Sequence, residues 1–205
     1  FSLHAPVTRN YIWEWVYLKL LEDEGLPSLR YSFRPLIVNG KNLGIYSQEE
    51  HFDKILLESN SFKEGPIIKL DETGYWLKKH QNLNSNTEDE YFKSTSSGFK
   101  LKSIIRKEDL KNSFLLANQI LNAFRTGLID TSTAFDKKLL SKYLAINDLT
   151  DAHHGSEWIN ERFYFDTVQG KLIPIGFDGD GVNEFVLKEL SIHKKDPWRV
   201  NYFND

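Results

Sequence analysis

Two aspartates near the end of the chain have the residue type and spacing needed to bind a metal ion. Asp178 and Asp180 follow a predicted apolar strand, with Gly179 between them and Gly181 behind them. Alternation along an extended chain would put both carboxylates on one side, and the glycines would let the backbone approach an ion or phosphate closely. Hard cations such as Mg²⁺ prefer carboxylate oxygens. The alternative is an ordinary acidic turn, since Asp-Gly is a common turn dipeptide.

An asparagine and a lysine elsewhere in the chain suit the same chemistry. Asn160 lies upstream of Asp178, just before an apolar strand. Protein kinases place an Asn and an Asp around a short hairpin in this way, and both bind Mg²⁺. Lys69 follows two isoleucines, as in the kinase strand whose lysine pairs with phosphates. Each residue also has a plainer interpretation, because an Asn before a strand is commonly a turn residue and a strand-end Lys is commonly just solvated.

A histidine-bearing polar segment carries groups able to bind zinc or to transfer protons. His153 and His154 lie among Asp148, Asp151 and Glu157. No His-Glu-x-x-His spacing is present, and adjacent histidines on an extended chain point in opposite directions, so a structural zinc site is poorly supported. A catalytic loop is better supported, because irregular polar segments between a helix and a hairpin commonly carry function. A metal-dependent phosphoester hydrolase is the function that a metal-binding cluster here would indicate.

Bulk composition indicates one globular domain, taken as 1–205. The chain has 205 residues, of which 40% are hydrophobic and 27% charged, and its formal net charge is −3. That charge gives no electrostatic reason to expect nucleic acid as a partner. The absence of cysteine excludes disulfides, thiolate metal sites and cysteine nucleophiles. No apolar run approaches the roughly 20 residues of a transmembrane segment. Because the chain contains no Met and starts with core-like residues, we expect a piece of a longer protein, and the sequence assigns no compartment.

The elements that must position these residues follow from apolar periodicity and turn signals. We predict helices over 10–24, 52–59, 108–125, 131–146 and 185–192. Strands are predicted as a hairpin of 31–38 and 43–46 around Asn39-Gly40, a run at 67–70, and a second hairpin of 163–165 and 171–177. The polar stretch 71–100 is expected to be a long loop or insertion, and 147–157 an irregular segment. This order of elements indicates an α+β fold with a mixed or antiparallel sheet.

Several blocks of the sequence resemble the CotH-like (spore coat protein H) family of atypical protein kinases. The blocks are PVTRN at 6–10, RYSF at 30–33, VNGKNLGIY at 38–46, EEHFDK at 49–54, EGPIIK at 64–69, WINERFYF at 158–165 and PIGFDGD at 174–180. They cover nearly the whole chain in the family's order. The resemblance implies an atypical kinase-like fold, with a small strand-rich N-terminal part and a helical C-terminal part that carries a catalytic hairpin.

The resemblance also implies an activity and roles for residues. The chain would be an ATP-dependent protein kinase that needs Mg²⁺ or Mn²⁺ and phosphorylates Ser or Thr of a coat or surface protein. Asp178 would bind the metal, with Asn160 as its partner ligand and Asp180 assisting. Lys69 and Glu50 would contact the nucleotide, and the protein would position and neutralise the transferring phosphoryl group.

One departure from the family pattern concerns the catalytic base. Kinases and the better-known family members place an Asp five residues before the Asn, and that position is Gly155 here. The family's usual His before the Asn is Ile159. His154 and Asp151 lie near enough in sequence to act as a substitute base. The alternative function is a nucleotide-binding but catalytically inactive relative that serves as an assembly or surface module.

Overall fold

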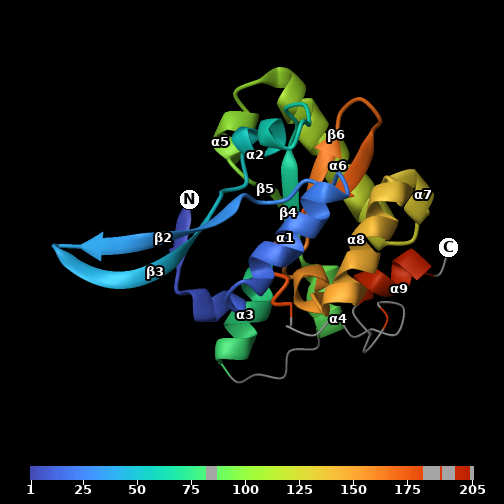
Figure 1. The fold of residues 1–205 in the computed structure, drawn as a ribbon. Coiled ribbons are helices and arrows are strands. Elements are labelled where there is room, and N and C mark those ends of the chain that lie inside the picture. Colours follow the sequence, from blue (N-terminus) through green and yellow to red (C-terminus); the bar gives the residue numbers. More distant parts are fainter. Residues whose placement is uncertain (82–86, 182–189, 191–196, 204–205) are drawn as a thin grey trace.

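The computed structural model describes residues 1–81, 87–181, 190 and 197–203. Within these residues the chain is an α+β protein with two small antiparallel sheets, one packed among helices and the other extending from them (Figure 1). The α+β class predicted from the order of elements is therefore confirmed, whereas its kinase-like character stays a prediction. No helix in the described part is long and apolar enough to cross a bilayer. The helix predicted over 185–192 falls almost wholly outside the described residues.

The first sheet forms a projecting arm. Its strands are ordered β1-β3-β2, namely β1 (Ser2–His4), β3 (Lys41–Glu49) and β2 (Tyr31–Val38). Asn39 and Gly40 have φ angles of 52° and 76°, which is the left-handed backbone of the tight two-residue turn that the Asn-Gly pair predicted. The hairpin of β2 and β3 extends away from the rest of the molecule (Figure 1).

The second sheet holds the strand that leads to the two aspartates. Its order is β5-β4-β6-β7, with bounds β5 (Ser96–Gly98), β4 (Ile67–Leu70), β6 (Arg162–Asp166) and β7 (Lys171–Pro174). The predicted second hairpin is thus confirmed as β6 and β7. In the register of β4 with β6, Lys69 lies opposite Arg162. The sheet therefore brings the candidate lysine to the end of β6 at which Asn160 also lies.

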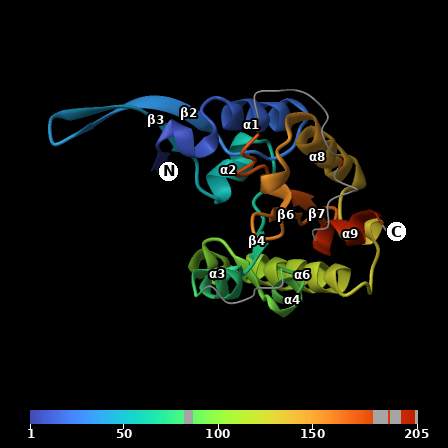
Figure 2. The same cartoon turned by 90° about the horizontal axis from the view of Figure 1, so that it is seen from below.

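Helices cover both faces of this second sheet (Figure 2). One layer contains α1 (Trp13–Asp23) and α8 (Lys137–Thr150), and the opposite layer contains α6 (Glu108–Arg125). The predicted helix stop at Gly25 is confirmed by its φ of 81° just beyond α1. Outside 71–100, the smaller helices of the described residues are η1 (Pro6–Arg9), α2 (Lys54–Ser59), α5 (Leu101–Ile104), α7 (Thr131–Ala134), η2 (His153–Ser156) and α9 (Pro197–Phe203).

The stretch 71–100 is not the long loop that its polar composition predicted. It contains α3 (Thr73–His80), α4 (Thr87–Lys93) and the strand β5. These elements are polar because most of their surface is exposed, but Tyr91 of α4 is buried against Trp158. Lys78 pairs with Glu90 and so joins the two helices. Tertiary contacts therefore form helices that composition alone did not indicate.

The single helix predicted over 131–146 is divided in two. Phe135 is extended, with φ −118° and ψ 157°, and its ring packs at 4.9 Å from Phe124 and 5.5 Å from Phe163, measured between ring centres. Asp136 then caps α8 by accepting a hydrogen bond from the backbone of Leu139 at 3.0 Å. Helix α8 continues to Thr150, so the predicted irregular segment 147–157 begins as helix and is irregular only around η2.

Candidate active site

The segment that carries the two aspartates is a tight loop rather than the end of an extended strand. Asp178 and Asp180 have φ angles of 51° and 48°, in the left-handed region that Asp tolerates better than most residues. The alternation expected of an extended chain is therefore wrong here. The Asp178 side chain is 17% exposed, while Asp180 is exposed to solvent. The structure thus singles out Asp178 as the carboxylate set into the molecule.

The loop packs backbone to backbone against the turn η2. A Cβ added at Gly155 would lie 2.6 Å from the carbonyl oxygen of Phe177 and 3.1 Å from Cα of Gly179. A Cβ added at Gly179 would lie 2.6 Å from Cδ1 of Tyr17 in α1. The two separations of 2.6 Å are shorter than heavy atoms in contact tolerate, and the one of 3.1 Å is tight. The position at which kinases carry their catalytic Asp therefore has no room for a side chain in this structure.

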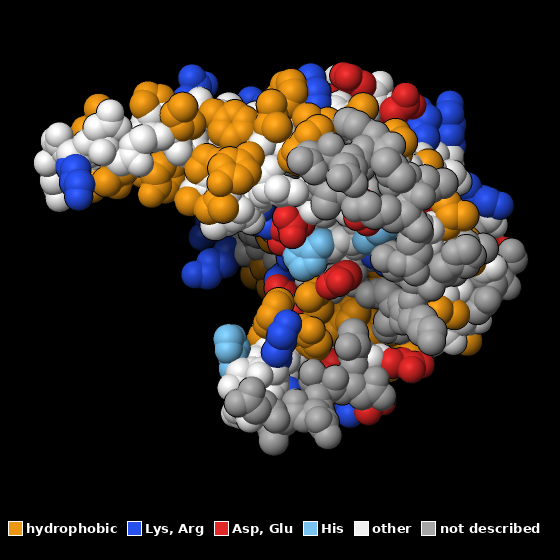
Figure 3. All heavy atoms as spheres, turned by 60° about the horizontal axis from the view of Figure 1, so that its bottom comes forward, with side chains coloured by type: hydrophobic (Ala, Val, Ile, Leu, Met, Phe, Trp, Pro, Cys, Tyr) orange, Lys and Arg blue, Asp and Glu red, His pale blue; other side chains and the backbone are white. Residues whose placement is uncertain are grey.

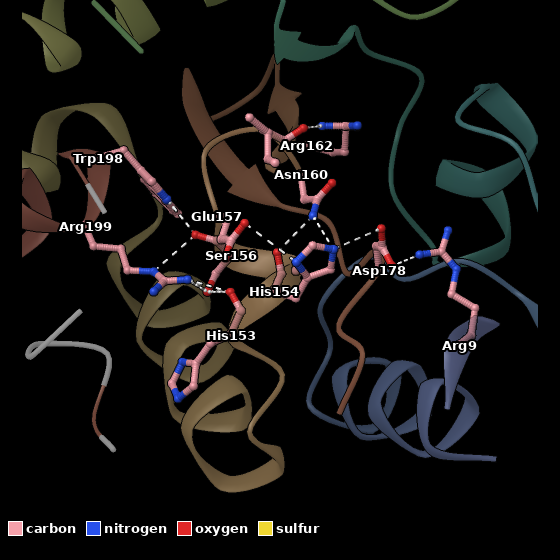
Figure 4. A network of polar contacts seen from close by, with 12 residues as sticks. Arg9, His153, His154, Ser156, Glu157, Asn160, Arg162, Asp178, Trp198 and Arg199 are labelled. Carbon is pink, nitrogen blue, oxygen red and sulfur yellow. Dashed lines mark hydrogen bonds and ion pairs between the residues drawn. The ribbon is translucent and has the colours of Figure 1, made fainter. Parts of the chain in front are cut away.

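Asp178, His154 and Asn160 converge at this contact (Figure 4). The Nε2 atom of His154 lies 3.6 Å from Oδ2 of Asp178 and 3.1 Å from Nδ2 of Asn160. The same Nδ2 donates a hydrogen bond to the carbonyl oxygen of His154 at 3.0 Å. Because both contacts share one histidine nitrogen, Oδ2 of Asp178 and Nδ2 of Asn160 lie within about 7 Å of each other.

The imidazole of His154 is held from its other side by Glu157. The Nδ1 atom of His154 lies 3.6 Å from Oε2 of Glu157, and the His154 side chain is 42% exposed. Hydrogen bonding to Glu157 raises the pKa of His154 above its ordinary value of 6.5, and the same contact lowers the pKa of Glu157. The carboxylate thereby orients the ring so that Nε2 faces Asp178 and Asn160.

His153 points away from this group (Figure 4). Its ring nitrogens lie 3.8 Å from Asp148 and 3.8 Å from Asp151. The cluster that sequence proximity suggested is therefore split, and Asp151 lies with His153 rather than with Asp178. Among the residues that the structure describes, no group of three or more His, Asp or Glu side chains is arranged to hold a metal ion. The geometry gives no support to the alternative of a hydrolase built on this cluster.

The turn η2 is fastened by a helix that the sequence analysis did not identify. Arg199 of α9 is 2% exposed and donates hydrogen bonds to the carbonyl oxygens of His153 at 2.6 Å and Ser156 at 3.1 Å. Trp198 Nε1 donates to the same Ser156 oxygen at 2.7 Å. These contacts fix the backbone on which His154 stands. Nothing in the sequence near Arg199 signals this role, because it depends on where α9 packs.

An arginine from the N-terminal segment pairs with Asp178. The Arg9 guanidinium forms an ion pair with Oδ1 of Asp178, lies 3.9 Å from Oε2 of Glu49, and stacks 5.3 Å from the ring centre of Phe177. Burial raises the pKa of Glu49, although the charge of Arg9 opposes that rise. Arg9 lies in one of the family-like blocks, but neither its type nor its spacing predicted a contact with Asp178.

A cleft opens beside Arg9 and Phe177. It has a volume of about 490 Å³, and its lining includes Glu49, Glu50 and Phe99. Figure 3 shows histidine and acidic side chains in a hollow of the surface, next to the apolar side chains of the projecting arm. A cleft of this size, bordered by apolar rings and a few charged groups, has the dimensions and lining of a small-molecule site.

Positive charge gathers around the rings that border the cleft. The Arg162 guanidinium lies 5.1 Å from the ring centre of Phe177, 5.8 Å from that of Phe99 and 6.0 Å from that of Phe52. Arg162 is buried, and its charge was not singled out from the sequence. Lys69 Nζ lies 5.9 Å from the ring centre of Phe99. The structure therefore places Lys69 beside the aromatic group that lines the cleft.

The two predicted nucleotide contacts do not pair with each other. Lys69 Nζ contacts both carboxylate oxygens of Glu72 at 2.8 Å. The Glu50 carboxylate instead accepts hydrogen bonds from Arg30, including one from Nε at 3.0 Å. Glu50 nevertheless lines the cleft. The acidic partner of Lys69 is thus Glu72, a residue that sequence spacing alone did not select.

The donor atoms at the convergence suit a hard divalent cation. Asp178 offers carboxylate oxygens, and Asn160 can ligate a metal only through Oδ1, because its Nδ2 is a hydrogen-bond donor. Mg²⁺ is commonly held by one or two protein carboxylates together with substrate phosphates. The residues present therefore fit a metal ion that arrives with a phosphorylated ligand.

Comparison with known proteins identifies the family of the chain. A search of curated proteins gave no match. The family model described as CotH kinase protein matches residues 2–199 of the 205-residue chain. This match confirms the resemblance drawn from the sequence blocks, and the chain belongs to the CotH kinase family.

Proposed function

We propose that the protein is an ATP-dependent kinase that requires a divalent cation and transfers the γ-phosphoryl group to a Ser or Thr hydroxyl of a protein. Membership of the CotH kinase family suggests a kinase-like function. The observation that carries the finer proposal is the convergence of Asp178 and Asn160 on His154, next to a cleft of about 490 Å³. Coat and cell-surface proteins are the substrate class that the family resemblance suggests.

The polar and charged residues of the site would have separate roles in phosphoryl transfer. Asp178 and Asn160 would hold Mg²⁺ or Mn²⁺, which when bound neutralises charge on the triphosphate. Lys69, beside the cleft, would contact a phosphate oxygen, and Arg9 would give the site a second cation close to Asp178. In the transfer, the bond from the γ-phosphorus to the bridging oxygen of ADP breaks as the bond to the substrate hydroxyl oxygen forms. Catalysis then rests on positioning and charge stabilisation.

We assign the role of general base to His154. The hydroxyl proton of the substrate has to leave, and the residue at the kinase base position, Gly155, has no side chain. His154 Nε2 faces Asp178, whereas Asp151 faces His153. Only the unprotonated imidazole accepts a proton, and hydrogen bonding to Glu157 raises the pKa of His154. The rate should therefore rise with pH through that raised pKa.

Nucleotide binding is tested by thermal unfolding with ATP and Mg²⁺. A ligand at 100 times its dissociation constant stabilises the folded form by about 2.7 kcal/mol, which for a chain of this size raises Tm by roughly 5–10 °C. Asp178→Asn should lose the Mg²⁺-dependent part of this rise. Asp23→Asn, an exposed position at the end of α1, is the matched control and should retain it. An equal rise in the Asp178→Asn variant would refute the metal-binding role of this residue.

One observation favours a second candidate, a family member that binds nucleotide without transferring phosphate. Gly155 stands where the catalytic Asp of kinases would be, and the surrounding backbone leaves no space for a side chain there. Incubation with radiolabelled ATP and Mg²⁺ or Mn²⁺, with and without casein as acceptor, separates the candidates. Incorporation that is lost in Asp178→Asn and His154→Ala supports the kinase. A clear Tm rise with no incorporation under any condition supports the binding module.

A further inference from the structure

A buried carboxylate lies directly beneath the loop that carries Asp178. Glu14 projects from the first turn of α1 and has 0% of its surface exposed. Its Oε1 accepts a hydrogen bond from the backbone N–H of Gly179 at 3.4 Å, and its Oε2 accepts one from that of Asp180 at 3.2 Å. Two successive backbone N–H groups that point at one anion form a nest. Here the two N–H groups point at a side-chain carboxyl of the same protein.

Burying the Glu14 carboxylate costs free energy of folding, and the hydrogen bonds that it accepts offset part of that cost. Removing a carboxylate from water is unfavourable, and an apolar side chain of similar size would suit a buried helix face better. The cost is visible in the titration of the group, because burial raises the pKa of Glu14 from 4.5 to about 7. Both of its carboxylate oxygens accept hydrogen bonds from backbone N–H groups of the loop. The contacts of Glu14 therefore serve the loop.

A second residue of the same segment holds the other end of the loop. Asn10 Nδ2 donates a hydrogen bond to the carbonyl oxygen of Gly181 at 2.6 Å. Asn10 itself has a φ of 49°, a left-handed conformation in which Asn is several-fold enriched. Asn10 and Glu14 lie one helical turn apart in sequence, so one short segment grips the loop at residues 179–181.

We infer that Glu14 is a positioning residue for Asp178. The peptide group that Glu14 binds at Gly179 follows Asp178 directly, so fixing that N–H fixes the left-handed backbone of Asp178. That backbone directs the Asp178 carboxylate to His154.

Glu14 forms no hydrogen bond with His154 or Asn160 in this structure. It reaches Asp178 through the loop, and its carboxylate also interacts with the charge of Arg9, the ion-pair partner of Asp178. The expected effect of Glu14 on metal and nucleotide binding rests on the proposed function. Its two hydrogen bonds to the loop do not.

The hold on the loop is measured first, without any ligand. Backbone amide hydrogen exchange, followed by NMR on the Glu14→Gln variant, should be at least about 10-fold faster at Gly179 and Asp180 than in the wild type. Gln keeps the size of Glu, but its NH₂ group turns a donor toward one of the two N–H donors. The control is Glu22→Gln on the exposed face of α1, where the carboxylate pairs with Lys19. Exchange at wild-type rates in Glu14→Gln would overturn the inference.

The functional arm measures the affinity for Mn²⁺–ATP. Glu14→Gln should weaken that affinity about 10–100-fold, the range for residues that orient a metal ligand, while the affinity for ATP without metal changes little. A merely structural residue would weaken both alike, and that result, or wild-type Mn²⁺–ATP affinity, would overturn the positioning role. If the wild type binds no Mn²⁺–ATP but the exchange result stands, the proposed function fails and the hold of Glu14 on the loop is kept.

Asn10→Gly covers the case in which Glu14→Gln does not fold. This substitution removes the hydrogen bond from the half-buried side chain to Gly181, and Gly tolerates the left-handed backbone of this position, so the far-ultraviolet circular dichroism should be unchanged. Its expected effect is a smaller loss, of about 3–10-fold, confined to the Mn²⁺-dependent part of ATP affinity. An unchanged Mn²⁺–ATP affinity in Asn10→Gly would argue against a positioning role of the 10–14 segment.

Discussion

Replacing Gly155 by Ala is the most direct test of the backbone contact between η2 and the loop of Asp178. The added Cβ would lie 2.6 Å from the carbonyl oxygen of Phe177, 3.1 Å from Cα of Gly179 and 3.3 Å from its backbone nitrogen. These three atoms belong to the main chain, so no side-chain rotation relieves the overlap. Either the loop or η2 has to move.

The expected cost follows from what overpacking does in protein cores. Extra methyl groups in a packed interior typically cost about 1–3 kcal/mol, and the upper half of that range applies here because rigid backbone is displaced. For a chain of this size, each kcal/mol lowers Tm by about 2–4 °C. Urea unfolding of Gly155→Ala should therefore show a free energy of unfolding about 2–3 kcal/mol below that of the wild type, with an unchanged m-value.

The control is Gly74→Ala in α3. A Cβ there meets only the terminal Oε2 of Glu90, at 3.1 Å, which can move aside, and Ala favours the helix by up to about 1 kcal/mol. Gly74→Ala should be neutral or stabilising. Wild-type stability in Gly155→Ala would refute the close packing that the structure describes. Phosphate transfer gained by Gly155→Asp would refute the statement that this position has no room for a base.

Three further changes test other parts of the site. Arg9→Ala removes the cation that pairs with Asp178, so the nucleotide-free protein should bind Mn²⁺ several-fold more tightly by isothermal calorimetry; weaker binding would contradict the reasoning. Arg199→Met leaves the buried carbonyl oxygens of His153 and Ser156 with fewer donors, and urea unfolding should show a loss of roughly 3 kcal/mol. Burial raises the pKa of Glu49 above 4.5, so the folded chain keeps this proton to a higher pH than the unfolded chain does. The free energy of unfolding should therefore fall as pH rises from 4.5 through the raised pKa, and Glu49→Gln should flatten that part of the profile.

Some elements could be predicted from the sequence because the residues that define them lie within the element itself. The Asn39-Gly40 turn and the end of α1 at Gly25 depend on backbone preferences that a sequence displays directly. The division of α7 from α8 does not, because Phe135 is held extended by rings from α6 and β6. The helices within 71–100 likewise depend on the burial of Tyr91 against a distant tryptophan.

The residues of the candidate site differ in the same way in whether the sequence could predict them. Asp178 and Asn160 could be selected because their residue types suit a metal and they flank a predicted hairpin. Arg9 and Glu14 could not, because their contacts exist only once η1 and α1 lie against the loop. The split between His153 and His154 agrees with the rule that neighbouring side chains diverge, but which histidine faces Asp178 is a property of the folded turn.

The residues that support the site are far apart in sequence, because Arg9 lies in η1 and Arg199 in α9. During translation, the turn that presents His154 is therefore made before the helix that braces it. On the proposed function, a polypeptide that lacks α9 should be unable to retain ATP. Chains truncated before Pro197 should pass through immobilised nucleotide, whereas chains that include a docked α9 should be held.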